Sequence, residues 1–464
     1  MVQSIGARRI TQGVIWKQLL IFFFPILLGS LFQQLYNTVD TIVVGRFVGT
    51  PALAAVGATA ALINLINGFF IGVSTGATVL LSQFYGARNR EGVEQALHTG
   101  MAMSLLLGVA VMALGMGLSP QVLRWMDTPE GCLPDAAVYT QIYFSGAIFS
   151  MVYNMGAGIL RARGDSRRPT LFLLIACLVN IVMDLVCVVE LNMGVAGAAV
   201  ATVLSQGVSA ALVLVVLCRK TEGEVPLRLG RLRLEMGLMK RIAYVGVPAG
   251  LQFITFDLAN VLIQSGVNSF GETAVAAWTA YIKTDALTWQ ISGAFGISVT
   301  TFVGQNFGAQ RYDRIRKSVW TCMAMSVGLV GLLSALVMVF RGRILGIYTP
   351  DPQVIDLGSY IMLFTVPFNF LFMPVEVFAG TMRGTGYSLM PTVITCLCVC
   401  VFRVAWLFTV VSRCHAIELL AVCYPLSWVL ASAVFFIAYR RGTWLRKRIE
   451  MCGLEPEIRD GKPV

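Results

Sequence analysis

A 13-residue stretch, GILRARGDSRRPT at residues 158–170, recurs as GTMRGTGYSLMPT at residues 380–392. Six of the 13 positions are identical, where background composition predicts about one. The same offset of 222 residues relates QFYGA at 83–87 to QNFGA at 305–309. The chain is therefore built from two related halves.

The composition is that of a membrane protein. Hydrophobic residues make up 57% of the chain, charged residues make up 13%, and the mean hydropathy is +0.75. Soluble proteins carry about 25% charged residues. Twelve apolar runs are each long enough to cross a hydrocarbon core of about 30 Å. They lie at roughly 15–45, 52–82, 95–118, 136–160, 170–190, 195–218, 242–270, 273–304, 318–340, 355–382, 391–411 and 416–439.

These runs predict an all-α integral membrane protein with 12 transmembrane helices in two six-helix lobes. Six spans per half is an even number, so we expect a pseudo-two-fold axis along the membrane normal to relate the lobes. The predicted parts are an N-terminal lobe (1–218), a cytoplasmic linker (219–240), a C-terminal lobe (241–440) and a basic cytoplasmic tail (441–464). Such a duplication is typical of transporters that bind their substrate between the repeats.

The residue types that enzymes and metal centres need are scarce. Only His98 and His415 are present, so neither a histidine metal centre nor a Ser-His-Asp triad is expected. The chain contains no phosphate-binding Gly-x-x-x-x-Gly-Lys-Ser/Thr loop. We therefore expect no enzyme activity, no cofactor and no resident metal. The net charge of +11 reflects membrane topology and anionic lipid, and it requires no nucleic-acid partner.

Ionisable groups inside the N-terminal spans are the strongest functional signal. Asp40 lies in span 1, Asn180 and Asp184 lie four residues apart in span 5, and Thr202 lies in span 6. At about 1.5 Å per residue they lie about 8 to 15 Å from the outer ends of their spans, which allows one site. Such a carboxylate pair either shares a proton or holds a sodium ion with the Asn and Thr oxygens. The alternative is a buried hydrogen-bond cluster with no role in transport.

The C-terminal spans carry charges of both signs. The candidate residues for a network or for substrate contacts are Asp257, Lys283, Asp285, Arg403 and Glu376. Because cations are present here, a neutralised Lys283–Asp257 pair that locks the lobe is an equally good interpretation. Glu376 lies in the inner half of span 10 and is the weaker candidate.

Several motifs together resemble those of the multidrug and toxic compound extrusion (MATE) transporters over roughly residues 10–440. Pro25 precedes Asp40 by fifteen residues, TIVVGR follows at 41–46, Gly-Ala follows span 2, and the Arg-x-x-Gly corner is paired. In one MATE branch an Asp in span 1, an Asn-x-x-x-Asp in span 5 and a Thr in span 6 bind the coupling cation. The resemblance implies this role for Asp40, Asn180, Asp184 and Thr202.

A second MATE branch couples sodium through C-lobe carboxylates in spans 7 and 10. Asp257 and Glu376 could stand in for these carboxylates, but Lys283 and Arg403 are additions to that pattern.

The predicted function is secondary antiport in the bacterial plasma membrane, with both termini cytoplasmic. The protein, expected to be a monomer, would export small amphipathic or cationic compounds in exchange for protons or sodium. Gln34, Asn37 and Asn154 are candidate substrate contacts in the cleft, and Pro25, which removes one backbone hydrogen bond, is the candidate hinge. The alternative is a flippase for a lipid-linked sugar precursor. A flippase would be expected to line its cleft with several cations for the pyrophosphate, whereas the spans here offer only Lys283 and Arg403.

The basic residues predict the orientation. With the N-terminus inside, 28 of the 35 Lys and Arg residues fall on the cytoplasmic side and five fall outside. In a background without native cysteines, a cysteine introduced at Pro129 should react with an impermeant reagent added outside, and one at Gly223 should not. The opposite labelling pattern would overturn this topology.

Overall fold

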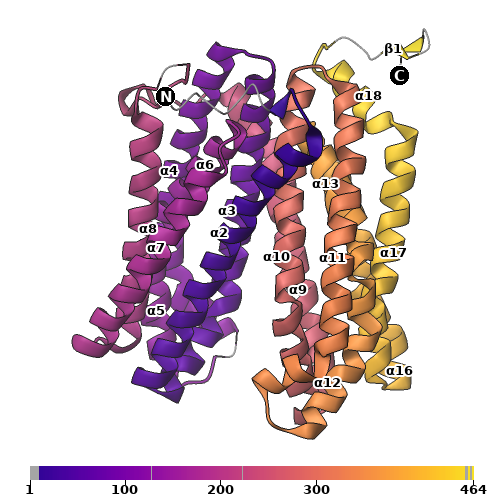
Figure 1. Cartoon of the computed structure of the whole chain (residues 1–464). Helices are drawn as coiled ribbons and strands as arrows, with labels where there is room; N and C mark the ends of the chain where they lie inside the picture. Colours follow the sequence, from indigo (N-terminus) through magenta and orange to yellow (C-terminus); the bar gives the residue numbers. More distant parts are fainter. Residues whose placement is uncertain (1–9, 127, 222, 455–457, 460–461, 464) are drawn as a thin grey trace. The chain divides into compact units, whose positions relative to one another are not determined.

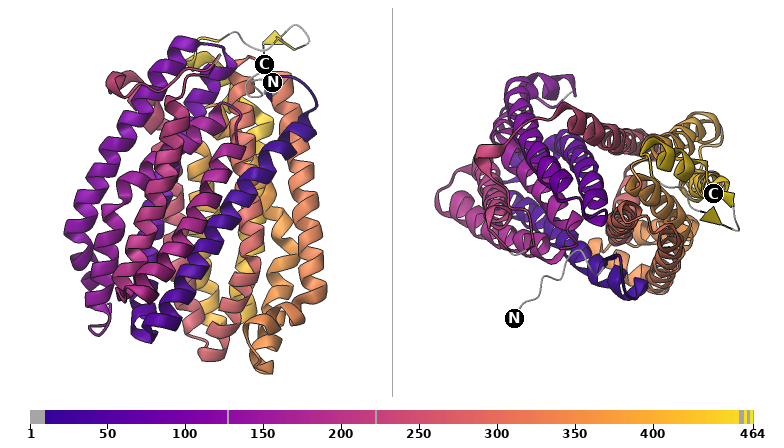
Figure 2. Two further views of the ribbon diagram at one scale, coloured as in Figure 1. Left: turned by 60° about the vertical axis from the view of Figure 1, so that its left-hand side comes forward. Right: turned by 90° about the horizontal axis from the view of Figure 1, so that it is seen from above.

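The computed structural model describes residues 10–126, 128–221, 223–454, 458–459 and 462–463. These residues form two compact units. Unit 1 comprises Met1–Ile10 and Ile21–Gly250, and unit 2 comprises Thr11–Leu20 and Leu251–Val464. Two helices, α2 and α9, therefore each pass from one unit to the other. In each unit the long helices run side by side as a bundle (Figures 1 and 2).

The first half of the chain contains the spans of the first repeat and the linker. In chain order its elements are α2 (Ile15–Val43), η1 (Val44–Val48), α3 (Thr50–Gly86), α4 (Arg90–Trp125), α5 (Leu133–Ser145), α6 (Ala147–Ala162), α7 (Arg167–Asp184), η2 (Leu185–Glu190), α8 (Gly194–Cys218) and η3 (Leu229–Arg231). The segments η1 and η2 are π-helical and continue α2 and α7 without a break.

The second half repeats this arrangement. Its elements are α9 (Met236–Asn268), α10 (Glu272–Gly308), α11 (Tyr312–Tyr348), α12 (Pro352–Thr365), η4 (Val366–Phe372), α13 (Met373–Gly384), α14 (Leu389–Thr395), η5 (Cys396–Val401), α15 (Phe402–Trp406), η6 (Leu407–Val411), α16 (Ser412–Cys414), α17 (Ile417–Arg441) and α18 (Thr443–Met451). The tail beyond 441 carries α18 and two paired two-residue strands, β1 (Ile458–Arg459) and β2 (Lys462–Pro463).

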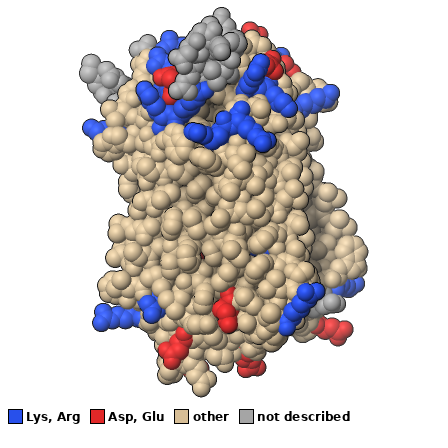
Figure 3. Space-filling view, turned by 90° about the vertical axis from the view of Figure 1, so that its right-hand side faces the viewer, with Lys and Arg blue, Asp and Glu red and all other residues tan. Residues whose placement is uncertain are grey.

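The predicted helical membrane fold is confirmed. Within the described residues, ten helices or continuous helical runs are long and apolar enough to cross a bilayer. The pair α5 and α6, bent by 47°, forms an eleventh span. Helix α10 spans 37 residues and occupies the predicted span at 273–304, which contains Lys283 and Asp285. A helix pairs its backbone N–H and C=O groups internally, and it must do so in a membrane because the hydrocarbon core offers these groups no hydrogen-bond partners. On the face in Figure 3, Lys and Arg gather toward the two ends and leave a broad uncharged band between them.

The repeated motif forms the same tight corner in both halves. Gly164 and Gly386 have φ angles of 93° and 86°, which favour glycine, and each follows the end of a helix. The amide of Gly164 bonds to the carbonyl of Arg161, and that of Gly386 to the carbonyl of Arg383, both at 2.8 Å. The shared motif therefore encodes a shared turn into the next span.

The linker (219–240) is held against the helices of unit 1 by an ion pair and hydrogen bonds. Arg163, which is buried, pairs with Glu224 at 3.0 Å and donates to the carbonyl of Val225 at 2.8 Å. The amide of Arg228 donates to Nε2 of His98 at 3.1 Å. Because a backbone amide can only donate, Nε2 must accept, and the imidazole proton lies on Nδ1, 2.7 Å from the carbonyl of Glu94.

Two Gly-x-x-x-Gly segments bring α3 and α9 into backbone contact within unit 1. A Cβ added at Gly72 would lie 2.3 Å from the amide nitrogen of Gly250. One added at Gly76 would lie 2.2 Å from the carbonyl oxygen of Ile242, and one at Gly246 would lie 2.9 Å from Cα of Val73. Small residues permit this close packing, which is a main source of helix association in membranes.

We expect Gly76→Leu to destabilise the protein by about 3 kcal/mol or more, because the new side chain meets backbone atoms that cannot move aside. Gly57→Leu on the same helix is the matched control, since a Cβ at Gly57 has no atom within 4 Å. Thermal unfolding in detergent should show a large fall in midpoint for Gly76→Leu only. Equal midpoints for the two variants would contradict the glycine contact.

Candidate functional site

Asp40 is a buried carboxylate near the end of α2. Its Oδ2 accepts a hydrogen bond of 3.4 Å from the hydroxyl of Tyr139 on α5, and its Oδ1 has no hydrogen-bond partner in the described chain. The π-helical segment η1 begins four residues later. Such segments are frequent at functional sites because they displace side chains from the regular helical position.

Asn180 and Asp184 on α7 and Thr202 on α8 are also buried. Among the described residues, neither carboxylate oxygen of Asp184, neither polar atom of the Asn180 carboxamide, nor the hydroxyl of Thr202 has a hydrogen-bond partner. Asp184 lies close enough to Asp40 for the two carboxyl groups to interact electrostatically. Asp184 is the last residue of α7, and the π-helical segment η2 begins directly after it.

A small polar cavity of about 50 Å³ lies one helical turn away from these residues. It is lined by Tyr36 on α2, Ala176 on α7 and Gln206 on α8, with Gln33, Asn67, Tyr143, Ser150, Tyr153, Leu173, Cys177, Ser205 and Ser209. Residues four apart share one helix face, so Asp40, Asn180 and Thr202 continue the faces that line the cavity. The four predicted residues therefore lie at one end of it. We call Asp40, Asn180, Asp184 and Thr202 the carboxylate cluster.

An apolar layer lies one turn beyond the carboxylate cluster on the other side. It is a packed set of buried residues from the same three spans, from α3 and from α5: Val43, Val44, Ala52, Tyr139, Val188, Val195, Ala198 and Ala199. The cluster therefore lies between a polar cavity and a tightly packed apolar layer.

The carboxylate cluster offers oxygen ligands and no fixed counter-charge. No ion pair of Asp40 or Asp184 with Lys or Arg is found within the described residues. Removing an unpaired carboxylate from water costs several kcal/mol, and two close carboxylates repel each other. A proton shared by the pair, or a hard cation held by carboxylate, amide and hydroxyl oxygens, would offset that cost.

Two buried charged residues of unit 2, Asp285 and Arg403, each contact a different set of uncharged partners. Asp285, buried on α10, accepts a hydrogen bond of 2.6 Å from Nδ2 of Asn369 in η4. Arg403, also buried, donates from Nε to the hydroxyl of Ser427 at 3.0 Å, and its guanidinium carbon lies 3.9 Å from the ring centre of Tyr424. Its Nη2 has no hydrogen-bond partner in the part of the chain that the structure describes. Buried cations are stabilised by such aromatic faces.

Three predicted residues of the C-terminal network lie apart from this pair of sites. Glu376 on α13 forms an ion pair with Arg383 of the repeated corner at 3.5 Å, which ties it to the corner. Asp257 on α9 is half-buried and Lys283 on α10 is exposed. Among the described residues no ion pair joins Lys283 to Asp257, so the pairing considered from the sequence is not formed.

The predicted substrate contacts lie on helix surfaces. Gln34 and Asn37 are exposed on α2, and the neighbouring Gln33 lines the polar cavity. Asn154 on α6 donates to the backbone carbonyl of Ser150 at 2.9 Å.

Sequence reasoning also missed the tyrosines beside the carboxylate cluster, Tyr36, Tyr139 and Tyr143. The spacing of Tyr139 and Tyr143, four residues apart in an apolar span, was the available signal.

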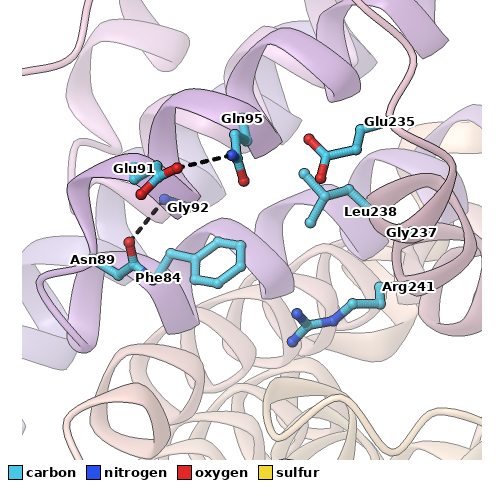
Figure 4. A pocket seen from close by; sticks show the side chains of 9 residues that line it. All are labelled: Phe84, Asn89, Glu91, Gly92, Gln95, Glu235, Gly237, Leu238 and Arg241. Carbon is cyan, nitrogen blue, oxygen red and sulfur yellow. Dashed lines mark hydrogen bonds between the residues drawn. The ribbon is translucent and has the colours of Figure 1, made fainter.

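A larger cavity of about 460 Å³ lies elsewhere in unit 1 (Figure 4). It is lined by residues at the end of α3, the start of α4 and the start of α9: Phe84, Asn89, Glu91, Gly92, Gln95, Glu235, Gly237, Leu238 and Arg241. None of the predicted site residues contributes to it. We therefore do not assign this cavity as the transport site, although it is larger, because the unpaired carboxylates lie elsewhere.

A duplicated bundle of membrane-spanning helices with buried, unpaired carboxylates defines a multi-pass membrane transporter. The family model MatE matches residues 25–186 and again residues 248–409, which together are well over half of the chain. The chain belongs to this family, which is a family of transporters and not of enzymes.

Relatives from bacteria match almost the whole chain. The probable multidrug resistance protein YoeA of Bacillus subtilis is 29% identical, over 96% of this chain and 98% of its own length. A protein of Shewanella oneidensis described as an FAD transporter is 23% identical, over 92% of this chain and 95% of its own length.

Solved structures share the fold. A MOP superfamily transporter from Pyrococcus furiosus has a TM-score of 0.88 and 24% identity, covering 95% of this chain and 99% of its own. A MATE structure in a bent conformation has a TM-score of 0.88 and 23% identity, covering 95% and 99%. One in a straight conformation has the same score and identity, covering 96% and 99%. The predicted MATE fold is thereby confirmed.

Proposed function

We propose that this protein is a secondary antiporter of the bacterial plasma membrane that exports amphipathic, mainly cationic compounds. Protons or sodium ions entering at the carboxylate cluster drive the export. The observation that carries the proposal is the burial of Asp40 and Asp184 together, with unpaired oxygens and no Lys or Arg partner among the described residues. The multidrug resistance protein named above, 29% identical, supports the substrate class.

A coupling ion and an exported compound must bind the two transport states with different affinity. Loading the carboxylate cluster changes the charge and the hydrogen bonding of Asp40 at one end of α2. Pro25 leaves the same helix without one backbone hydrogen bond, which makes bending there inexpensive. Solved MATE structures recorded as bent and as straight support two states of this kind. Bending of α2 would therefore link ion binding to the transport cycle.

Contacts of α2 with α7 support a special role for Pro25. The hydroxyl of Thr170 donates to the carbonyl of Pro25, and a Cβ at Gly29 would lie 3.1 Å from Cδ1 of Leu173. Thr170 is part of the repeated motif, and its counterpart Thr392 has a buried hydroxyl without a partner in the described chain. Asp184 lies on the same helix as Thr170. The hinge and one cluster carboxylate are therefore joined through α7.

A second candidate function is transport of an anionic substrate such as a lipid-linked sugar precursor. Arg403, buried with an uncommitted Nη2, is the observation that favours it, together with the relative described as an FAD transporter. A single buried arginine is a weak match for a pyrophosphate, which usually binds several cations. The two functions can be separated by measuring the efflux of a cationic dye and of an anionic dye from vesicles. Repeating the measurement under an imposed pH gradient and then under a sodium gradient identifies the coupling ion.

We expect Asp40→Asn to abolish transport with expression and fold intact. The amide keeps the size and much of the hydrogen bonding, but it can neither exchange a proton nor supply charge to a sodium ion. Asp184→Asn should have the same effect, and the double variant should be no worse than either single one, because the two groups act as one unit. Drug resistance of cells at matched protein level is the measurement.

Glu376→Gln is the control for these variants, since Glu376 pairs with Arg383 and lies outside the carboxylate cluster. Its effect on resistance should be milder. Wild-type resistance in Asp40→Asn cells would mean that the cluster has only a structural role.

Pro25→Ala should lower turnover strongly and leave substrate binding to the resting state nearly unchanged. Alanine supplies the missing amide, so the straight helix is stabilised over the bent one. Pro248→Ala should have a smaller effect, because Ile263 replaces Asp40 at the matching position downstream. Transport rate and binding affinity in reconstituted vesicles separate the two effects. Equal defects in the two variants would remove the special role of span 1, and normal transport by Pro25→Ala would exclude the hinge.

A further inference from the structure

Helices α2 and α9 each begin in one unit and continue in the other, and we call them the crossing helices. The segment Thr11–Leu20, which contains the start of α2, belongs to unit 2, and α2 continues in unit 1 from Ile21. Helix α9 starts in unit 1 at Met236 and continues in unit 2 from Leu251. A crossing helix can transmit a bend to the unit in which it begins only if its start is held there.

In unit 2 the side chain of Arg314 holds the start of α2. Arg314 lies in the first turn of α11. Its Nη1 donates to the carbonyl of Gly13 and its Nη2 donates to Oε1 of Gln18, both at 2.9 Å. The guanidinium carbon also lies 5.6 Å from the ring centre of Phe302 on α10. A planar guanidinium that bonds to two acceptors and stacks on a ring fixes both the position and the direction of the group that it holds.

The two acceptors are arranged by a turn that precedes α2. Gly13 has a φ of 87°, which favours glycine, and a Cβ there would lie 2.8 Å from Nε2 of Gln18. That Nε2 donates to the carbonyl of Gln12, and Oε1 of the same amide accepts from Arg314. Leu19, the next residue, is buried. The turn and the first residues of α2 are therefore held together, and we call Gly13, Gln18 and Arg314 the clasp.

Unit 1 holds the start of α9 through a related contact. The offset of 223 residues between Pro25 and Pro248 makes Arg241 the counterpart of Gln18. The guanidinium of Arg241 lies 5.5 Å from the ring centre of Phe84, near the end of α3 (Figure 4). Helices α3 and α10 are counterparts, so each crossing helix starts beside a guanidinium that stacks on a phenylalanine of the second helix of a repeat. The crossing helix itself supplies the arginine in unit 1, whereas α11 supplies it in unit 2.

The two starts differ in what else holds them. The start of α9 also has the backbone contacts of Gly246 and Gly250 with α3, and Arg241 is exposed. The clasp consists of directed hydrogen bonds to a backbone carbonyl and to a side-chain amide. Loss of the arginine should therefore matter more at the start of α2 than at the start of α9.

We propose that the clasp holds the start of α2 in unit 2 and that bending at Pro25 is thereby transmitted to this unit. This inference rests on the proposed function, in which loading of Asp40 bends the same helix. Arg314 touches neither the ion nor the exported compound in this mechanism, so it is a positioning residue. Without the clasp, the start of α2 follows the rest of the helix, and the bend is absorbed there without effect on unit 2.

The ion dependence of substrate affinity measures this transmission, because two coupled sites change each other's affinity by the same factor. The full-length protein in nanodiscs is titrated with the cationic dye ethidium at low and at high pH, and again with and without sodium. In the wild type, loading of the carboxylate cluster should change the dye affinity by about fivefold or more. Arg314→Met keeps an apolar stem beside Phe302 but has no N–H donor, and it should bring the ratio of the two affinities close to one.

Other variants separate the clasp from a loss of charge. Lys317→Met is the matched control, because it removes an exposed cation from the same end of α11, and it should leave the ratio unchanged. Arg314→Lys keeps the charge without the planar fork, so its ratio should be intermediate. Gln18→Met removes one acceptor, and its combination with Arg314→Met should be no worse than Arg314→Met alone. Arg241→Met should have a smaller effect than Arg314→Met.

Hydrogen exchange shows separately whether the clasp holds the helix. The backbone amides of Leu19 and Leu20 should exchange faster in Arg314→Met than in the wild type and in Lys317→Met. Faster exchange together with the loss of ion dependence would support the proposal. Unchanged exchange in Arg314→Met would overturn it.

The failure of this inference is distinguishable from the failure of the proposed function. A wild-type protein whose dye affinity depends on neither pH nor sodium would refute the proposed function, and the coupling role of Arg314 would fall with it. Ion dependence that is present in the wild type and survives in Arg314→Met would refute the role of the clasp alone.

Discussion

Two carboxylates, Asp40 and Asp184, are buried in an apolar bundle without a cationic partner among the described residues. The rest of unit 1 must offset the free energy that their removal from water costs. An unpaired carboxylate at such a place is destabilised by several kcal/mol, so it must bind a proton or another cation. The polar cavity lies one helical turn away on one side of the cluster, and packed valines and alanines lie on the other side. In the mechanism that we propose, this asymmetry gives an ion site access from one direction only.

The two repeats keep one scaffold and differ in their charges. Both halves retain the glycine corner after an arginine, Arg161 in one and Arg383 in the other. Asn154 in unit 1 corresponds to Glu376 in unit 2, and only Glu376 forms an ion pair with its corner arginine. Unit 2 contains Asp285 with an amide partner and Arg403 against aromatic rings. In the cluster, Asp40 accepts one long hydrogen bond from Tyr139, and Asp184 accepts none from the described residues. Duplication therefore preserved the turns that fold the lobes, and divergence placed the uncompensated charge in one of them.

Features with strong local signals could be predicted from the sequence. Long apolar runs give spans, because hydrocarbon leaves the backbone no alternative to a helix, and i, i+4 spacing placed Asn180 and Asp184 on one face. Contacts between distant spans could not be predicted in this way. Tyr139 donates to Asp40 across 99 residues, and Asn369, which donates to Asp285, lies in the 3-10 segment η4 of span 10. Lys283 and Asp257 were compatible partners by depth, but rotation of each helix about its axis decides such a pairing, and depth carries no information about rotation.

The duplicated prolines lie where the chain changes unit. The first span begins within the segment Thr11–Leu20, which belongs to unit 2, and it continues in unit 1 from Ile21. Pro25 follows four residues later. In α9 the chain leaves unit 1 after Gly250, two residues beyond Pro248. A helix that lacks one backbone hydrogen bond bends most easily at that point, so each proline is placed where bending is most useful. Only the first of these helices also carries a carboxylate of the cluster. In the mechanism that we propose, the same helix therefore senses the ion and bends, because Asp40 lies fifteen residues after Pro25.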